Sequence, residues 1–266
     1  MIGIFDSGFG GLTILQEIQK QLPEYNYLYF GDNANAPYGC RSTEEIYDLT
    51  KNAVTYLFEH GCQLVILACN TASAQALRRL QQEFLPVHYP KHRVLGIIVP
   101  TIEQIVESQN IHSVGILGTT MTIEAGSYQR EIQKHRPNIE VFGQACPTLC
   151  RLIEDNSHPD LLEEHIIKYL SLLPDNLDAV LLGCTHYEII ANQIQKHLPA
   201  TTLLFEQPKM IASSLKNYLQ RHSEIELHLE KNGGTTFLTS GEPNKISQTA
   251  SLFFNQEISF QKLNAH

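Results

Sequence analysis

Short apolar runs alternate along the chain with longer segments in which apolar residues recur at helical spacing. The runs end in Gly, Asp, Cys or Asn, and each is short enough for a strand buried on both faces. This alternation is typical of parallel strands joined by helices. The predicted strands are Ile2–Phe5, Tyr27–Phe30, Leu64–Ala68, Val94–Val99, Ser113–Leu117, Glu140–Gln144, Ala179–Leu182, Thr202–Phe205 and Thr235–Thr239. The predicted helices include Glu44–His60, Thr101–Ser108, Ser127–His135, Leu161–Leu173 and Lys209–Arg221.

An internal repeat relates two parts of the chain. GIFDS at 3–7 corresponds to GILGT at 115–119, and LVILACNT at 64–71 corresponds to AVLLGCTH at 179–186. The nearly equal offsets predict an α/β protein with two pseudo-symmetric, doubly wound parallel-sheet domains that face each other across a central cleft. We expect residues 1–96 plus 208–266 to form the first domain and residues 97–207 to form the second.

Each repeat carries a cysteine directly after an apolar strand. Cys69 lies between the run at 64–68 and a helical segment, and Cys184 occupies the matching place in the second repeat. The free N–H groups and dipole of a helix N-terminus lower a thiol pKa, so this position favours a thiolate. A single buried cysteine is more often a small apolar residue. Two cysteines at matching positions of the repeat, with polar Asn, Thr and His residues beside them, favour a functional interpretation.

The first strand-to-helix junction, FDSGFGG at 5–11, admits two interpretations. Its glycine spacing is not the G-x-G-x-x-G of a dinucleotide site, although Asp32 follows the next strand. Glycines at this place also allow a small anion to approach a helix N-terminus, and Asp6 alone would be read as a helix cap. The turn-rich segment DNANAPYG at 32–39 could close over a ligand.

Other candidate groups are weaker on sequence alone. His186 is two residues from Cys184, which makes a proton-handling role plausible, whereas Glu154 reads as a surface carboxylate. The remaining cysteines, at 40, 62, 146 and 150, are interpreted as structural thiols, and their spacing predicts no metal site. No G-x-S-x-G elbow is present, and no lysine adjoins the strand ends to hold pyridoxal phosphate.

Composition restricts the partners. The 266 residues carry a formal net charge of −9, which argues against nucleic acid. No apolar run is long enough to span a membrane, and the N-terminal segment has no export signal. We therefore expect a cytoplasmic protein.

Six segments resemble the signature blocks of the glutamate racemase family, in order and at similar spacing. They are FDSGFGG at 5–11, DNANAPYG at 32–39, ACNTAS at 68–73, GTTMT at 118–122, LIE at 152–154 and LGCTHYEII at 182–190, and FLTSGEP at 237–243 extends the resemblance. The resemblance implies a cofactor-independent racemase with two α/β domains, and it leaves open assembly as a homodimer. Its members interconvert L- and D-glutamate and supply D-glutamate for peptidoglycan.

The resemblance also implies roles for individual residues. Cys69 and Cys184 match the two catalytic acid/base groups, and Asp6, Glu154 and His186 match the groups that assist them. The residues that match substrate contacts are Asp6, Ser7, Tyr38, Gly39, Asn70, Thr71, Thr119, Thr122, Thr185 and His186. None of the matched blocks contains Arg or Lys, so we expect helix N-termini and neutral donors to hold the substrate carboxylates.

Three departures and two alternatives remain. Glu188 stands where the family usually has proline, Glu206 stands near a position often held by aspartate, and the 81–93 segment is longer than in the shortest members. These departures put oligomer contacts, regulation and loop geometry in doubt. The same two-thiol chemistry could act on aspartate or another amino acid. A binding protein without catalysis is the other alternative, and the presence of both strand-end cysteines argues against it.

Overall fold

The first of two parallel sheets contains both ends of the described chain. The computed structural model describes residues 1–254 and 256–263. The sheet has the order β10-β9-β2-β1-β3-β4, and every neighbouring pair is parallel. Its strands are β1 (Ile2–Asp6), β2 (Tyr27–Gly31), β3 (Leu64–Leu67), β4 (Arg93–Gly96), β9 (Thr235–Thr239) and β10 (Phe260–Lys262).

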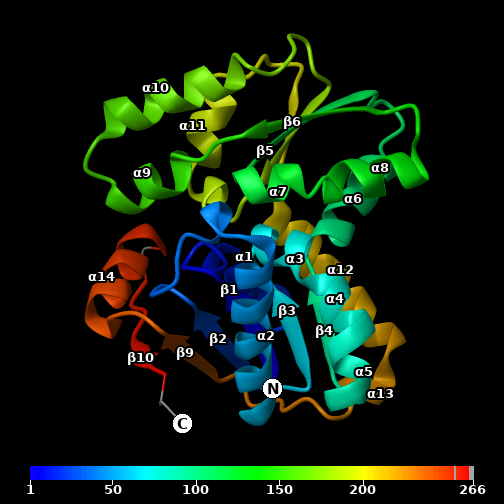
Figure 1. Cartoon of the computed structure of the whole chain (residues 1–266), viewed down its shortest axis with the longest axis vertical. Coiled ribbons are helices and arrows are strands. Elements are labelled where there is room, and N and C mark those ends of the chain that lie inside the picture. The colour runs from blue at the N-terminus through cyan, green and yellow to red at the C-terminus, as the bar shows by residue number, and fades with distance from the viewer. Residues whose placement is uncertain (255, 264–266) are drawn as a thin grey trace.

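The second sheet lies above the first in Figure 1, where it is green to yellow. It has four parallel strands in the order β6-β5-β7-β8. They are β5 (Ser113–Gly118), β6 (Glu140–Ala145), β7 (Ala179–Gly183) and β8 (Leu203–Phe205). Together the two sheets confirm the predicted fold class.

The strand orders explain the sequence repeat. Within the first sheet, β2-β1-β3-β4 has the same order as β6-β5-β7-β8 in the second. The two cysteine segments follow the equivalent strands β3 and β7. In each sheet, the second strand along the chain (β2 or β6) lies on one side of the first strand (β1 or β5), and the third (β3 or β7) lies on its other side. The strand order therefore reverses between β1 and β3 and between β5 and β7. Ligands bind at such reversal points, outside the carboxyl ends of the strands.

Helices cover both faces of each sheet because the strands are apolar on both sides. α1 packs on α12 against one face of the first sheet, and α2 covers the other. α6 and α8 cover one face of the second sheet, and α9 to α11 cover the other. The longer helices are α1 (Leu12–Gln21), α2 (Thr43–Glu59), α6 (Ile98–Glu107), α8 (Ser127–His135), α10 (Pro159–Leu170), α12 (Gln207–Arg221) and α14 (Pro243–Phe254).

Shorter helical segments lie at the junctions. They are η1 (Tyr38–Cys40), α3 (Asn70–Gln75), α4 (Leu77–Arg79), η2 (Leu80–Phe84), α5 (Leu85–His88), α7 (Thr120–Glu124), α9 (Leu149–Asp155), η3 (Tyr187–Ile190), α11 (Ala191–Lys196) and α13 (Ser223–Glu226). No helix in the described part of the chain is long and apolar enough to cross a membrane.

One sequence prediction about elements was wrong, and one strand was missed. The apolar run at 94–99 is not one strand, because β4 ends at Gly96 and α6 begins at Ile98. Pro100 lies in the first turn of α6, where a proline needs no amide partner. The short strand β10 was also not predicted. It occupies the sheet edge beside β9 and has one buried residue, Phe260, so it lacks an apolar run. The proposed domain limits at 96/97 and 207/208 stay a prediction.

Candidate active site

The carboxyl ends of four strands bring most of the predicted site residues around one cavity. Asp6 ends β1 beside Cys69 after β3, and Thr119 follows β5 beside Cys184 after β7. The cavity has a volume of about 30 Å³, room for about two water molecules. It is lined by Ser7, Ala36, Pro37, Tyr38, Gly39, Cys69, Asn70, Thr71, Thr119, Cys150, Glu154, Cys184, Thr185 and His186.

Cys69 caps the N-terminus of α3, as its sequence position predicted. Its Sγ accepts a hydrogen bond from the Ala72 N–H at 3.5 Å and donates to Ser7 Oγ at 3.4 Å. Burial and the neighbouring Asp6 charge nevertheless raise the pKa of Cys69 to about 11, against the opposing effect of these contacts. The expected lowering of this pKa was therefore wrong, because desolvation outweighs the helix terminus.

Cys184 is paired with a second thiol. Its Sγ lies 3.5 Å from Sγ of Cys150, which belongs to α9. The hydrogen bond from Cys184, together with the positive charge of His186, lowers the pKa of Cys150 below its ordinary value despite burial. The same pairing and burial raise the pKa of Cys184 well above its ordinary value. Cys150 was interpreted as a structural thiol, and its contact with Cys184 in the cavity wall was not predicted.

His186 and Glu154 form an ion pair at the edge of the cavity. Nε2 of His186 lies 2.8 Å from Oε1 of Glu154. Burial disfavours a charged imidazole, but Cys150, Glu154 and Asp6 together favour it and raise the pKa of His186 to about 9. Glu154 is thus more than a surface carboxylate, and a protonated His186 supplies a positive charge at this site. Among the described residues that line the cavity, none is Arg or Lys.

Asp6 lies behind the cavity wall and joins the two halves. Its Oδ2 accepts the Gly8 N–H at 3.1 Å, and its Oδ1 accepts the Thr185 hydroxyl at 3.4 Å. The carboxyl is completely buried, and desolvation raises its pKa although His186 and backbone N–H groups act against this. Gly10 allows the two halves to approach each other closely, since a Cβ at position 10 would lie 2.7 Å from Oγ1 of Thr185 and 2.8 Å from the backbone nitrogen of His186.

Three threonine hydroxyls form a second contact between the halves. Thr71 Oγ1 lies 2.9 Å from Thr119 Oγ1 and 3.3 Å from Thr122 Oγ1, and the latter two are 2.9 Å apart. Thr71 and Thr119 reach the cavity, whereas Thr122 is buried behind them. The cluster offers rotatable hydroxyl donors on the cavity wall.

Asn70 reaches the cavity, but its side-chain amide is engaged elsewhere. Its Nδ2 donates a hydrogen bond to Gln207 Oε1 at 2.7 Å, and its Oδ1 accepts a hydrogen bond from the Tyr128 hydroxyl. Gln207 in turn donates to Thr101 at 2.9 Å and to Tyr128 at 2.8 Å. A substrate contact from Asn70 would therefore come from its backbone N–H at the first turn of α3. Sequence analysis did not identify this buried network.

Tyr38 and Gly39 belong to the short helix η1, which also lines the cavity. The Tyr38 hydroxyl donates to Asp32 at 2.6 Å, which orients the segment that follows β2. Gly39 packs against Thr119, and a Cβ at this position would approach the Thr119 Cβ to 2.6 Å. Residues 36–39 thus form part of the cavity wall, and closure of the 32–39 segment over a ligand stays a prediction.

The sequence contained one signal that could have identified Cys150. Cys150 precedes Glu154 by four residues, and on a helix this spacing places both side chains on one face. Since Glu154 was already a candidate, the residue one turn earlier was the next to consider. Gln207 and Tyr128 had no comparable signal, because their contacts join distant segments.

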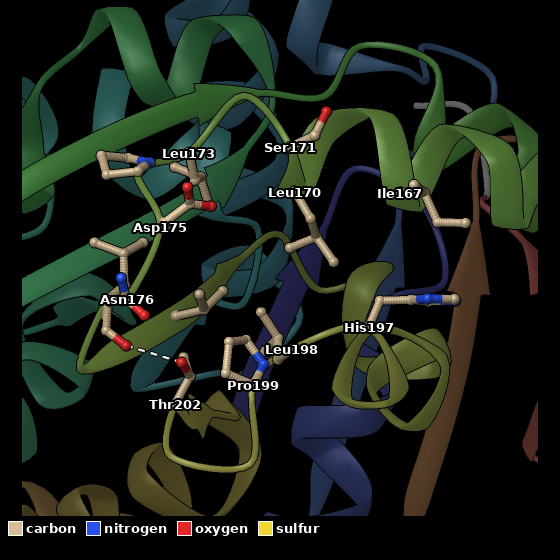
Figure 2. Close-up of a pocket in the computed structure, with 13 residues that line it drawn as sticks. Ile167, Leu170, Ser171, Leu173, Asp175, Asn176, His197, Leu198, Pro199 and Thr202 are labelled. Carbon is tan, nitrogen blue, oxygen red and sulfur yellow. Dashed lines mark hydrogen bonds between the residues drawn. The ribbon is translucent and has the colours of Figure 1, made fainter.

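A larger cavity lies elsewhere in the second half. Figure 2 shows it between the end of α10 and the turn before β8, with a volume of about 350 Å³. Leu170, Leu173 and Leu198 contribute apolar walls, and Thr202 donates to the Leu177 carbonyl at 2.8 Å. The cavity contains neither strand-end cysteine, so its size does not make it the candidate active site.

The chain is similar to known proteins over almost its whole length. The profile described as Asp/Glu/Hydantoin racemase matches residues 10–207. A glutamate racemase from Ruegeria sp. (strain TM1040) is 39% identical over 273 residues, which cover 98% of each chain. A crystal structure of glutamate racemase isoform RacE1 from Bacillus anthracis aligns with a TM-score of 0.89 at 29% identity, covering 99% of this chain and 97% of that one. The glutamate racemase of Francisella tularensis, solved in complex with D-glutamate, aligns with a TM-score of 0.87 at 29% identity and the same coverage.

Proposed function

The chain belongs to the Asp/Glu/hydantoin racemase family, and we propose that it interconverts L- and D-glutamate without a cofactor, with Cys69 and Cys184 as the two acid/base groups. The observation that carries the proposal is that these two thiols, one from each half of the repeat, line one cavity. The D-glutamate produced would supply peptidoglycan synthesis.

Racemisation requires removal of a proton from one face of the α-carbon and delivery of another to the opposite face. Two thiols from facing halves suit this requirement, because one can act as thiolate base while the other, still protonated, acts as acid. The handedness of the substrate decides which thiol is the base. Each turnover leaves the protonation of Cys69 and Cys184 reversed.

The acidity of the α-carbon limits this chemistry. A turnover of about 10 s⁻¹ corresponds to a barrier of roughly 16 kcal/mol. One pKa unit corresponds to about 1.4 kcal/mol. In solution near neutral pH, the pKa of the α-C–H can therefore exceed the pH by no more than about 12 units. The α-C–H must therefore behave as an acid of pKa about 19 or below. A higher thiol pKa does not relax this limit, because the thiol must then first lose its own proton to solvent.

Three kinds of group could bind the substrate and lower the α-C–H pKa to that range. Asp6 and Glu154 would keep the substrate ammonium charged. Protonated His186 would favour binding of an anionic substrate to this negatively charged protein. Neutral donors, including the Thr71 and Thr185 hydroxyls, would stabilise the charge that develops on the α-carboxylate. This extends the expectation based on neutral donors and helix N-termini, since His186 adds a cation.

The cavity is too small for an amino acid, so we infer that the halves separate for substrate entry and that, when they close again, the side chains that line the cavity lie farther apart around the substrate than they do here. A volume of about 30 Å³ holds about two waters. Closure would exclude bulk water and strengthen the electrostatic contacts within the site. The contacts at Gly10 and the threonine cluster would form on closure.

The decisive experiment is racemisation in D2O. Purified protein, dialysed and supplied with no cofactor, is incubated with L-glutamate, and optical rotation is followed together with α-deuterium incorporation. The proposal requires rotation to decay to zero while deuterium enters the α-position. Retention of both rotation and α-protium would refute it. L-aspartate run in parallel tests the alternative substrate, and faster racemisation of aspartate would favour that alternative.

A further inference from the structure

The proposed reaction gives no role to the third thiol, Cys150. Cys150 is half-buried in the cavity wall, and Cys184 and His186 are buried beside it. One potential ligand atom from each of these three residues lies within 4.8 Å of the other two. They come from separate parts of the fold: Cys150 from α9, and the other two from the turn after β7.

The spacing of these atoms is close to that of a zinc site. Zn²⁺ binds thiolate sulfur at about 2.3 Å in tetrahedral geometry, which places two sulfurs roughly 3.8 Å apart. The two sulfur atoms here are 3.5 Å apart. Binding therefore requires only a small outward movement of the thiols. Two thiolates and an imidazole are also among the ligand sets that zinc prefers.

The charge balance favours a divalent cation at this place. When the cation binds, the two thiol protons and the imidazolium proton leave to solvent, so two thiolates neutralise the +2 charge of the metal. Glu154 and the buried Asp6 add negative charge beside His186. Three protein ligands leave a fourth position for water or for a carboxylate, as in zinc sites that stay open to small molecules.

We propose that Cys150, Cys184 and His186 form a binding site for a thiophilic divalent cation such as Zn²⁺, and that its occupation blocks the enzyme by taking Cys184 as a ligand. The block of activity rests on the proposed function, whereas cation binding does not. Cys150 is the residue that completes the ligand set.

Cobalt binding tests the site directly, independently of activity. Reduced, full-length protein is titrated with Co²⁺ in the presence of a phosphine reductant, and absorption is recorded. We expect a thiolate-to-cobalt charge-transfer band that saturates at one Co²⁺ per chain and disappears when Zn²⁺ is added. Cys150→Val should weaken cobalt binding at least roughly tenfold. The matched control is Cys146→Ser, which removes a buried thiol four residues earlier that is outside the cluster and should leave the band intact.

Inhibition provides the second measurement. Zn²⁺ should inhibit racemisation at the concentrations at which it displaces cobalt, and a chelator should restore the rate. Cys150→Val, compared with its own zinc-free rate, should require at least roughly ten times more Zn²⁺. The absence of a charge-transfer band in the wild-type protein, or an equal response to metal in Cys150→Val, would overturn the proposal.

A measurement on the wild-type chain covers the case in which Cys150→Val does not fold. Zn²⁺ should slow alkylation of Cys150 and Cys184 by iodoacetamide, as read by mass spectrometry of peptides. The exposed Cys40 is the internal control and should react at an unchanged rate. Equal alkylation of Cys150 with and without Zn²⁺ would count against the site.

Discussion

Gly10→Ala tests whether the closed arrangement of the halves is the reactive one. A Cβ at position 10 would lie 2.7 Å from Thr185 Oγ1, 2.8 Å from the His186 backbone nitrogen and 2.9 Å from His186 Nδ1. The backbone nitrogen cannot move by a side-chain rotation. Relief of the clash must therefore displace the turn that carries Cys184 or separate the halves.

The cost follows from the contacts. Overpacking of a tightly packed place by one methyl group costs about 1–3 kcal/mol. If that cost falls only on the closed form, kcat/KM for glutamate should decrease roughly 5- to 150-fold, at about 1.4 kcal/mol per factor of ten. The melting temperature should fall by at most a few degrees, because opening relieves the clash without unfolding either sheet.

The assay is polarimetric racemisation at several substrate concentrations, with thermal unfolding measured on the same preparation. Gly8→Ala is the matched control: a Cβ at position 8 meets the same histidine ring, but at 3.4 Å, which is ordinary contact. Its activity should stay within about twofold of the wild type, since the added methyl group causes no overpacking. Wild-type activity in Gly10→Ala would refute the idea that catalysis needs the closed contact.

Three further predictions concern the thiols, the ion pair and the buried network. Cys69→Ser and Cys184→Ser should each lower kcat by at least roughly 100-fold in the racemisation assay, and full activity in either variant would exclude the two-base scheme. The pKa of His186 is raised from 6.5 to about 9 in the folded chain. Protonation of His186 therefore stabilises the folded state fully below pH 6.5, and this stabilisation is lost as the pH rises through 9. The difference in unfolding free energy between the wild type and His186→Gln, measured by urea titration, should therefore decrease between pH 6.5 and 9; a difference that does not depend on pH would argue against this origin. Gln207→Leu leaves buried partners of Gln207 without hydrogen bonds and should destabilise the protein by about 1–3 kcal/mol in chemical unfolding, whereas a loss below about 0.5 kcal/mol would mean that the network is dispensable.

Much of the fold could be predicted because local patterns determine it. The apolar run at 64–67 is buried on both faces, and its polar neighbours mark the strand end. Two similar segments at nearly equal offsets predicted two sheets, and these have matching strand orders. The prediction failed where the pattern was ambiguous, as at 97–99, where apolar residues continue from a strand into the first turn of a helix.

The chemistry of the site was less predictable, because pKa values depend on what surrounds a group in three dimensions. The helix N-terminus at Cys69 is visible in the sequence, but the burial that reverses its effect on the pKa is not. Similarly, the contact between Cys150 and Cys184 joins residues that are 34 positions apart. Sequence position identified the two thiols that follow strands, whereas the third, four residues before Glu154 on α9, was recognised from its place in the fold.

The repeat is symmetric in backbone but not in chemistry, and this asymmetry has a limited effect on the proposed reaction. Cys69 has Asp6 and Ser7 as neighbours, whereas Cys184 has Cys150 and His186. The two thiols therefore differ in their readiness to act as a base. However, enantiomers have equal free energies in water, so the equilibrium constant of racemisation is one, and kcat/KM must be the same in both directions. Unequal surroundings can thus change kcat and KM for L- and D-glutamate only in proportion, which means that the asymmetry alters how tightly each enantiomer is held but not the direction of the reaction.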